Sequence, residues 1–326
     1  MSQLNTVNWG ILSTARINQA IIPAIKNFEH AELYAVASRD ENKASAYAAE
    51  HGFAKSYGGY QKLLEDPEVQ AVYISLPNGL HFEWIKKAIE CEKHILCEKS
   101  ITTKVAEIRE IKRMAIEKDV LVMEGFMYRY HPFFQKVLEY AQSDLVGEVQ
   151  NIQISLAAWQ KNPHDIRLQP GLGPGVMGDV GCYCLNYCRA IMAGEPSSWE
   201  AFVRYNTQGI DMEASIQLIY NPWQIAQIFC SFTCNGSFAS IIGKKGRLFI
   251  VEPFGVRVGE REFLYFQNDK RSPEIVKISA EKTGHTLEIE DFTMAILEKR
   301  QPYLSLDDSI GNLTILEDVL TNGRIL

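Results

Sequence analysis

The feature that most constrains this fold is the alternation, from Val7 to about Gly125, of short apolar runs with segments of helical period. This pattern is typical of β-α-β units, in which helices join parallel strands and cover the sheet. Helices are expected over Phe82–Ile89 and Val105–Ala115, and Pro23 is expected to break or kink the first helix of the chain. The expected strands are Val7–Leu12, Ala31–Ala37, Ala71–Leu76, His94–Cys97 and Val120–Glu124.

The pattern changes after about residue 125. Apolar and polar residues alternate over Asn151–Ala158, as in a strand with one solvated face. Further strands are expected at Glu213–Ile219, Gln224–Phe232, Phe238–Ile242, Arg247–Val251 and Glu262–Phe266, and helices around Phe133–Tyr140, Leu287–Lys299 and Leu306–Leu320. The sequence therefore predicts an α/β protein with an N-terminal, doubly wound, parallel Rossmann sheet. A C-terminal α+β domain with a large, open, mostly antiparallel sheet follows it.

The length and composition limit the classes of protein. A chain of 326 residues exceeds the ~250–300 at which single cores stop growing, so two domains are expected, 1–124 and 125–326. The formal charge of −7 and the absence of a Lys/Arg block argue against nucleic-acid or membrane partners. The first residues lack a basic and apolar leader, and no apolar run is long enough to span a bilayer, so a cytoplasmic location is expected.

The cysteines agree with a reducing compartment. Their number, seven, is odd, which argues against a framework of disulfides. The spacing of Cys182, Cys184 and Cys188 could suggest a metal site, but only the last two share a helical face. Buried, apolar thiols are the preferred interpretation.

The first strand runs into a turn of small residues, Ser13-Thr14-Ala15-Arg16-Ile17-Asn18. Dinucleotide-binding turns need small residues here so that backbone N–H groups can approach the pyrophosphate. The glycine positions of that motif carry Ser13, Ala15 and Asn18, so the motif alone is weak and an ordinary strand–helix turn stays possible.

The end of the second strand bears on the choice of cofactor. An NAD-binding protein usually has an acidic residue there, whereas this chain has Ser38-Arg39. A hydroxyl and a guanidinium suit the 2′-phosphate of NADP, which is therefore favoured over NAD. In the alternative interpretation, Ser38 caps the next helix, Arg39 is solvated and Asp40 competes for the cap.

Five motifs in order resemble the glucose–fructose oxidoreductase/inositol dehydrogenase/MocA family. They are Gly10-Ile-Leu-Ser-Thr-Ala-Arg-Ile17, Leu76-Pro-Asn78-x-x-His81, Glu98-Lys99, Glu124-Gly-Phe-Met-Tyr-Arg129-Tyr-His131-Pro and Asp179-Val-Gly-Cys-Tyr183. Arg-Tyr-His-Pro and Arg167-Leu-Gln-Pro-Gly most resemble the branch of the dimeric dihydrodiol dehydrogenases and NADP-dependent xylose dehydrogenases. The resemblance covers nearly the whole chain.

The resemblance implies a catalytic set of Lys99, Tyr183 and Asp179, with the tyrosine as acid/base group. The spacing of Asp179 and Tyr183 also places them on one helical face. The family pattern is Glu-Lys-Pro, and Ser100 replaces the proline here. The residues expected to bind the cofactor are Ser13, Thr14, Ala15, Arg16, Ile17, Ser38, Arg39, Leu76, Asn78, His81, Glu98 and Lys99.

Substrate contacts are expected from Arg129, Trp159 and Arg167. Alternatively, Arg129 and His131 fix the domain junction, His81 caps a helix, and the glycines after Arg167 only form turns. No metal ligand is predicted.

The expected activity is NADP-linked hydride transfer at a sugar, polyol or dihydrodiol hydroxyl, or at the corresponding carbonyl. NAD remains an alternative cofactor. A non-catalytic NAD(P)-binding sensor and an NAD-dependent glycoside-cleaving enzyme are the alternatives, and Lys99, Asp179 and Tyr183 together argue against the sensor. The resemblance further implies that residues 1–124 bind the dinucleotide, and that residues 125–326 bind substrate and form a homodimer through the open sheet.

Overall fold

The computed structural model describes residues 6–268, 270 and 272–326. Their contacts define two compact units. The first takes in the described residues up to Met127 together with His285–Ile310, and the second consists of Tyr128–Gly284 and Gly311–Leu326. The segment 285–310, which the sequence-based boundary assigned to the second domain, thus packs with the first unit. Residues 1–5, on which the expectation about a leader rests, lie outside the described residues.

The first unit contains a six-stranded sheet in the order β3-β2-β1-β4-β5-β6, and every pair of neighbours is parallel. This is the strand order of a Rossmann fold, in which ligands bind where the order reverses, at the carboxyl ends of β1 and β4. The strands are β1 (Val7–Leu12), β2 (Ala31–Ser38), β3 (Lys55–Gly58), β4 (Ala71–Ile74), β5 (His94–Glu98) and β6 (Val122–Gly125).

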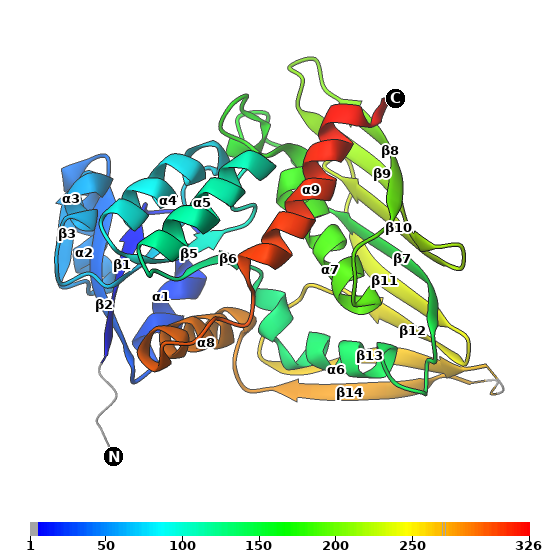
Figure 1. Cartoon of the computed structure of the whole chain (residues 1–326). Helices are drawn as coiled ribbons and strands as arrows, with labels where there is room; N and C mark the ends of the chain where they lie inside the picture. The colour runs from blue at the N-terminus through cyan, green and yellow to red at the C-terminus, as the bar shows by residue number, and fades with distance from the viewer. Residues whose placement is uncertain (1–5, 269, 271) are drawn as a thin grey trace. The chain divides into compact units, whose positions relative to one another are not determined.

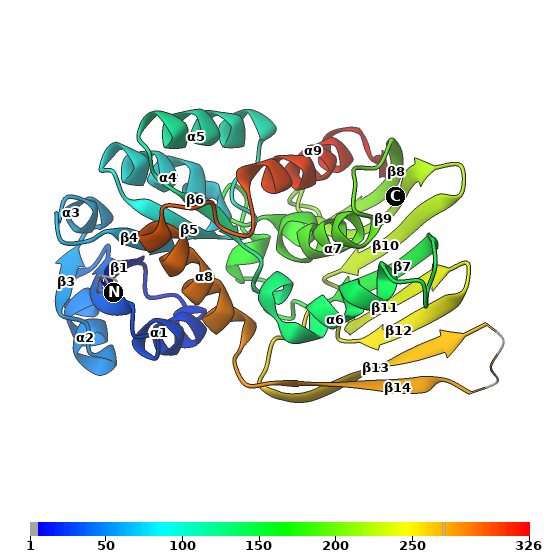
Figure 2. The ribbon, with the colours of Figure 1, turned by 60° about the horizontal axis from the view of Figure 1, so that its bottom comes forward.

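Helices cover both faces of this sheet. In Figures 1 and 2, α4 and α5 lie on one face, and α1 and α8 lie on the other. Helix α8 belongs here because Trp9, which is fully buried in β1, packs against it: its Nε1 donates to Thr293 Oγ1 (3.2 Å), and its ring lies 5.8 Å from that of Phe292. The helices are α1 (Asn18–Lys26), α2 (Glu41–His51), α3 (Tyr60–Leu64), α4 (His81–Glu90), α5 (Val105–Glu117) and α8 (Gly284–Glu298).

Helix α1 is continuous through Pro23, so the expected break at this residue is wrong. A proline removes only one backbone donor, and the following turn still closes, since Asn27 N donates to Pro23 O (3.1 Å). Ile21, Ile22 and Ile25 are buried on the same short helix. Packing of this apolar face compensates for the lost hydrogen bond.

The second unit contains a nine-stranded sheet in the order β14-β13-β12-β11-β7-β10-β9-β8-β15. Only β7 with β10 and β8 with β15 pair in parallel among these neighbours, so the predicted fold class is confirmed. The strands are β7 (Val149–Ala157), β8 (Ser198–Tyr205), β9 (Asp211–Asn221), β10 (Gln224–Ser231), β11 (Gly236–Gly243), β12 (Gly246–Val251), β13 (Gly259–Gln267), β14 (Glu274–Ala280) and β15 (Arg324–Ile325).

The helices described in this unit gather on one face of the sheet (Figures 1 and 2): α6 (Pro132–Ala141), α7 (Cys182–Met192) and the second half of α9 (Leu306–Asn322). Ser305 caps the start of α9, because its Oγ accepts from Asp308 N (3.3 Å). The strands alternate accordingly: in β10, Ile228 and Cys230 are buried, whereas Gln227 and Phe229 point to the other face.

All seven cysteines are free thiols, and Cys182, Cys184 and Cys188 are buried in α7. Burial raises the pKa of the Cys188 thiol, as expected of an apolar thiol in the core. Across the described residues, no group of three or more His, Cys, Asp or Glu side chains could hold a metal ion. In the same part of the chain, no helix is both long and apolar enough for a membrane span.

Candidate active site

A hydrogen-bond network fixes the turn between β1 and α1. Ser13 Oγ lies 3.0 Å from Ser75 Oγ and accepts from Ala15 N (3.1 Å). The buried Asn18 donates to Ser13 O (2.9 Å) and accepts from Ser75 Oγ (2.8 Å). The turn therefore has a defined conformation without the glycines of the usual motif. Its remaining predicted residues, Thr14, Arg16 and Ile17, precede the first helical residue of α1.

At the end of β2, the structure identifies the residue that caps the next helix. Asp40 is the N-cap of α2, because its carboxylate accepts from Lys43 N (2.9 Å). Arg39 therefore takes no part in capping the helix. Its guanidinium lies beside the Tyr60 hydroxyl. Burial raises the pKa of Tyr60, and the charge and hydrogen bond of Arg39 oppose that rise. The donor set at this strand end, a hydroxyl and an exposed guanidinium, fits a phosphorylated ribose.

Two of the predicted cofactor residues, Asn78 and His81, meet at the carbonyl of Ser100. Asn78 Nδ2 donates to Ser100 O (3.1 Å), and His81 Nδ1 lies 2.9 Å from the same oxygen. The other ring nitrogen of His81 lies 2.8 Å from Leu76 O, and the side chain is almost fully buried. His81 begins α4, and its ring links the loop after β4 to the residue after Lys99.

The loop after β5 is held from its other side by Glu124, at the carboxyl end of β6. Its Oε1 accepts from Ile101 N (2.9 Å). Lys99 therefore directly precedes two anchored residues, Ser100 and Ile101, at the carboxyl end of a parallel strand, although Ser100 replaces the family's proline. The Lys99–Ser100 peptide bond is cis, and the lysine is half-buried.

Buried acidic groups surround the base of this loop. The hydroxyl of the fully buried Tyr73 donates to Glu98 Oε1. Glu288, from α8, is buried, and its Oε1 has no hydrogen-bond partner among the described residues. Burial raises the pKa of Glu288 well above its ordinary value, and the charge of Glu98 adds to the rise. Burial therefore favours the protonated form of Glu288 more than in an exposed glutamate.

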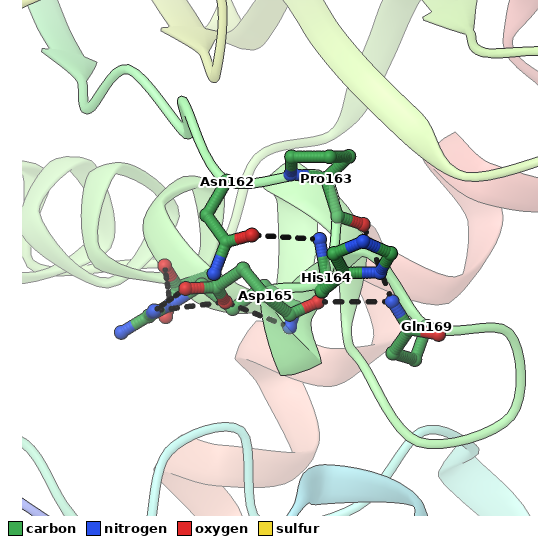
Figure 3. Close-up of polar contacts among 7 residues, drawn as sticks. Asn162, Pro163, His164, Asp165 and Gln169 are labelled. Carbon is green, nitrogen blue, oxygen red and sulfur yellow. Dashed lines mark hydrogen bonds and ion pairs between the residues drawn. The ribbon is translucent and has the colours of Figure 1, made fainter.

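In the second unit, the structure brings Arg167 and Asp179 together. Arg167 Nε lies 2.8 Å from Asp179 Oδ2, and its Nη1 donates to Asp165 Oδ1 (3.1 Å). Figure 3 shows the loop that carries the arginine, in which His164 N donates to Asn162 Oδ1 (3.0 Å) and Gln169 Nε2 donates to Pro163 O (3.3 Å). The loop is thus braced by its own polar groups, and the arginine is positioned between two carboxylates.

Asp179 and Tyr183 do not lie on one regular α-helix. Asp179 lies in a π-helical turn, Met177–Gly181, and Tyr183 follows in the first turn of α7. Single π-turns inside helices are frequent at functional sites because they redirect a side chain. The Tyr183 ring lies 5.9 Å from that of Tyr128 and 5.3 Å from that of Phe254, so aromatic packing orients the nearly buried phenol.

The other two predicted substrate residues have different surroundings. Arg129 is almost buried, and its Nη1 donates to Asn186 Oδ1 (3.1 Å), which also accepts from Tyr128 Oη (2.6 Å). Trp159 is half exposed on the loop after β7. Its backbone N–H donates to Asn235 Oδ1 (2.9 Å), and Lys161 Nζ lies 4.6 Å from its ring. Trp159 is accessible to a ligand, whereas Arg129 braces the base of α7.

Three residues that make contacts in these two units were not predicted: Glu124, Phe254 and Glu288. Glu124 was only part of a quoted motif, and its position at a strand end was the available signal. Phe254 lies between two strands, and Glu288 lies on a helix predicted for the second domain. Their roles depend on tertiary contacts that residue spacing does not report.

A six-stranded parallel sheet of this order, with a small-residue turn after its first strand, defines a dinucleotide-binding Rossmann protein. A model described as "Oxidoreductase family, NAD-binding Rossmann fold" matches residues 7–126, and one described as "GFO/IDH/MocA C-terminal domain" matches 134–249. The chain belongs to this family, the Gfo/Idh/MocA oxidoreductases, and the resemblance seen in its motifs is confirmed.

Similar proteins cover nearly the whole chain. D-xylose 1-dehydrogenase (NADP(+)) 2 of Haloferax volcanii is 32% identical over 322 residues, 97% of each chain. Trans-1,2-dihydrobenzene-1,2-diol dehydrogenase of Xenopus laevis is 28% identical over 326 residues, 96% of each. The crystal structure of KijD10, a 3-ketoreductase from Actinomadura kijaniata in complex with NADP and TDP-benzene, matches with a TM-score of 0.92, 26% identity and 99% of each chain.

Proposed function

We propose that this oxidoreductase uses NADP to transfer hydride between the nicotinamide and a hydroxyl of a sugar, polyol or dihydrodiol, or the corresponding carbonyl. The observation that carries the proposal is Lys99, anchored at the carboxyl end of β5 by contacts to Ser100 and Ile101 in a Rossmann unit. The names of the similar proteins support both the substrate class and the cofactor. We propose that the first unit, which contains the parallel sheet, is the cofactor domain, and that the second unit, Tyr128–Gly284 with Gly311–Leu326, is the substrate domain.

NADP fits the donor set of the first unit. The N–H groups that begin α1 would approach the pyrophosphate, and Ser38 and Arg39 would bind the 2′-phosphate. When bound, the cofactor supplies a nicotinamide ring that accepts or donates hydride. The remaining proposed contacts come from Thr14, Ala15, Leu76, Asn78, His81 and Glu98, which follow the strand ends of this unit.

The chain's own residues would handle the proton. We propose that Tyr183 takes the proton of the substrate hydroxyl, and that Lys99 orients the oxygen and stabilises its negative charge. Asp179, paired with Arg167, would orient the substrate or the tyrosine, with Trp159 as a further contact. In the reduction, the same groups act in reverse.

The first experiment measures NADPH formation with D-xylose and with trans-1,2-dihydrobenzene-1,2-diol as substrates. Lys99→Met and Tyr183→Phe should each lower kcat by about 10²–10⁴-fold, because each loses an acid/base or charge-stabilising group. Affinity for NADPH, measured by fluorescence, should stay within about twofold, a free-energy change smaller than one hydrogen bond contributes.

Lys104→Met, which changes an exposed lysine, is the control for the first variant. Wild-type turnover in either active-site variant would refute the assigned roles. NADPH binding by the wild-type protein without turnover of any sugar, polyol or dihydrodiol would favour the sensor.

The open face of the nine-stranded sheet supports a homodimer. Phe202 of β8, Phe229 of β10 and Phe238 of β11 lie in one row across this face, and each is about one-third exposed. Ser215 pairs with both Phe202 and Phe229, and Ser155 pairs with both Phe229 and Phe238. Three exposed phenylalanines on one uncovered face, separated only by small serines, are typical of an interface with another protein. We propose that a second copy of the chain covers it, in the cytoplasm, where thiols stay reduced.

A further inference from the structure

The glycine-rich loop before Asp179 rests directly on a buried carboxylate from another element. Asp211, the first residue of β9, is 6% exposed. Gly175 has a φ of +63°, and a Cβ added to it would lie 1.6 Å from Asp211 Oδ1. Only a glycine allows both this backbone conformation and this close approach.

The other carboxylate oxygen binds the start of the π-helical turn. Met177 N donates to Asp211 Oδ2 (2.7 Å), and both atoms are buried. Burial raises the pKa of Asp211 to about 7, and the backbone N–H groups of Met177 and Val176 favour its charged form and limit the rise. One side chain thus contacts both the glycine turn and the first residue of the turn that carries Asp179.

This contact has a direct consequence for the segment 175–183. The N–H groups that begin a helix have no intrahelical acceptor, and a buried start needs a partner from elsewhere. Asp211 is that partner: it accepts from the N–H of Met177, which lies two residues before Asp179. Without it, the glycine turn and the π-helical turn would lose their common attachment to the sheet.

We propose that Asp211 is a positioning residue for hydride transfer, which anchors the Gly175 turn and the start of the π-helical turn so that Asp179 and Tyr183 have a fixed orientation. This inference rests on the proposed function, because the roles of Asp179 and Tyr183 belong to it. Asp211 touches neither substrate nor cofactor in this role, and acts only through the backbone of the segment that it binds.

The test combines turnover with proteolysis. Asp211→Ala removes both acceptors, Asp211→Asn keeps one of them, and Gly175→Ala forces the carboxylate away. With D-xylose and NADP⁺, Asp211→Ala should lower kcat by about 100-fold, as expected for a misplaced catalytic group. The KM for NADP⁺ should stay within about twofold, and Asp211→Asn should recover part of kcat because one acceptor remains.

The matched control is Gly209→Ala. Gly209 also has a positive φ, +77°, but a Cβ there would meet nothing within 4 Å. Gly209→Ala therefore places an alanine at positive φ at the same free-energy cost as Gly175→Ala, about 1 kcal/mol. It should keep the wild-type kcat. If kcat falls strongly in Gly175→Ala but not in Gly209→Ala, the loss results from displacement of the Asp211 carboxylate and not from backbone strain at a positive φ.

Limited trypsin digestion gives a readout that does not need activity. Cleavage after Arg167, identified by mass spectrometry, should be about tenfold faster in folded Asp211→Ala than in the wild type, because the loop opens locally. Wild-type kcat and cleavage rate in folded Asp211→Ala and Asp211→Asn would overturn the inference, as would a loss of kcat that only follows the unfolded fraction.

If the wild-type enzyme turns over none of the tested substrates, the proposed function fails. The digestion rates then still decide whether Asp211 anchors the loop.

Discussion

Ser13 has a backbone conformation that side chains rarely adopt. Its φ is +103°, at the first position where dinucleotide-binding turns usually have glycine. Such a conformation costs of order 1–3 kcal/mol, so the surrounding contacts must over-determine it. Ser13 Oγ accepts from Ala15 N and forms a hydrogen bond with Ser75 Oγ, and these two bonds provide the compensation. A glycine has no side chain to form them.

Comparing Ser13→Ala with Ser13→Gly separates the two effects. Both variants lose the hydroxyl, but only alanine keeps a Cβ at positive φ. We expect Ser13→Ala to be less stable than Ser13→Gly by about 1 kcal/mol. Urea unfolding gives the two free energies, and equal values would mean that the turn relaxes in the alanine variant.

Arg39 determines the preference for NADP in the proposed function. Arg39→Ala should raise the Kd for NADP⁺ by about 10–100-fold, because a hydrogen bond to a charged group contributes ~1.5–3 kcal/mol. The Kd for NAD⁺, which lacks the 2′-phosphate, should not change. Arg113→Ala, in an exposed arginine of α5, is the control. An equal loss of affinity for both cofactors would show that Arg39 does not select between them.

At the scale of elements, α8 brings an acidic side chain into the core of the first unit. Folded Glu288 retains its proton above the ordinary pKa of 4.5, whereas the unfolded chain releases it there. Since the folded state then binds more protons, this group makes the free energy of unfolding fall as pH rises above 4.5. The fall ends only at the raised pKa of the folded state.

Glu288→Gln should remove that dependence, because the amide stays neutral and keeps an acceptor for Phe126 N. The variant should gain stability relative to wild type as pH rises from 4.5 towards neutral, by up to about 1.4 kcal/mol per pH unit. Urea unfolding across this range checks the slope, with the exposed Glu90→Gln as control. Parallel curves for Glu288→Gln and wild type would contradict a protonated Glu288.

The sequence predicted most elements because their patterns are local. The apolar run of β1 and the alternation of β7 require no tertiary information. The strands β3, β8, β14 and β15 were missed, although β8 alternates over Ser198–Tyr205 and could have been found. The π-helical turn at Met177–Gly181 has no comparable signal, since it depends on Asp211 in a different strand.

The candidate site was predicted unevenly for the same reason. Strand ends and motifs identified Lys99, Arg39 and Asp179, whose roles remain predictions. The contacts that position them come from residues distant in sequence, such as Glu124 for the loop after Lys99. The type and spacing of residues indicate which chemical role a side chain can have, whereas its orientation depends on contacts that form only on folding.

At the scale of the whole molecule, the open sheet face makes the assembly testable. We expect light scattering to give twice the chain mass of 36.9 kDa at micromolar concentration. Phe229→Lys with Phe238→Lys should give the monomer mass, because charges in the centre of an apolar interface cannot be solvated. Ile116→Lys changes a more exposed apolar side chain on α5 and should leave the mass unchanged. A monomeric wild-type protein would refute the dimer.

The packing of α8 against Trp9 also determines when the first unit can finish folding during synthesis on the ribosome. Trp9 emerges among the first residues, yet its partner Thr293 follows 284 positions later. A nascent chain that already contains the entire parallel sheet still lacks the cover of this tryptophan. The ribosome translates β7 to β14 of the second sheet before it translates His285–Ile310, the segment that completes the first unit.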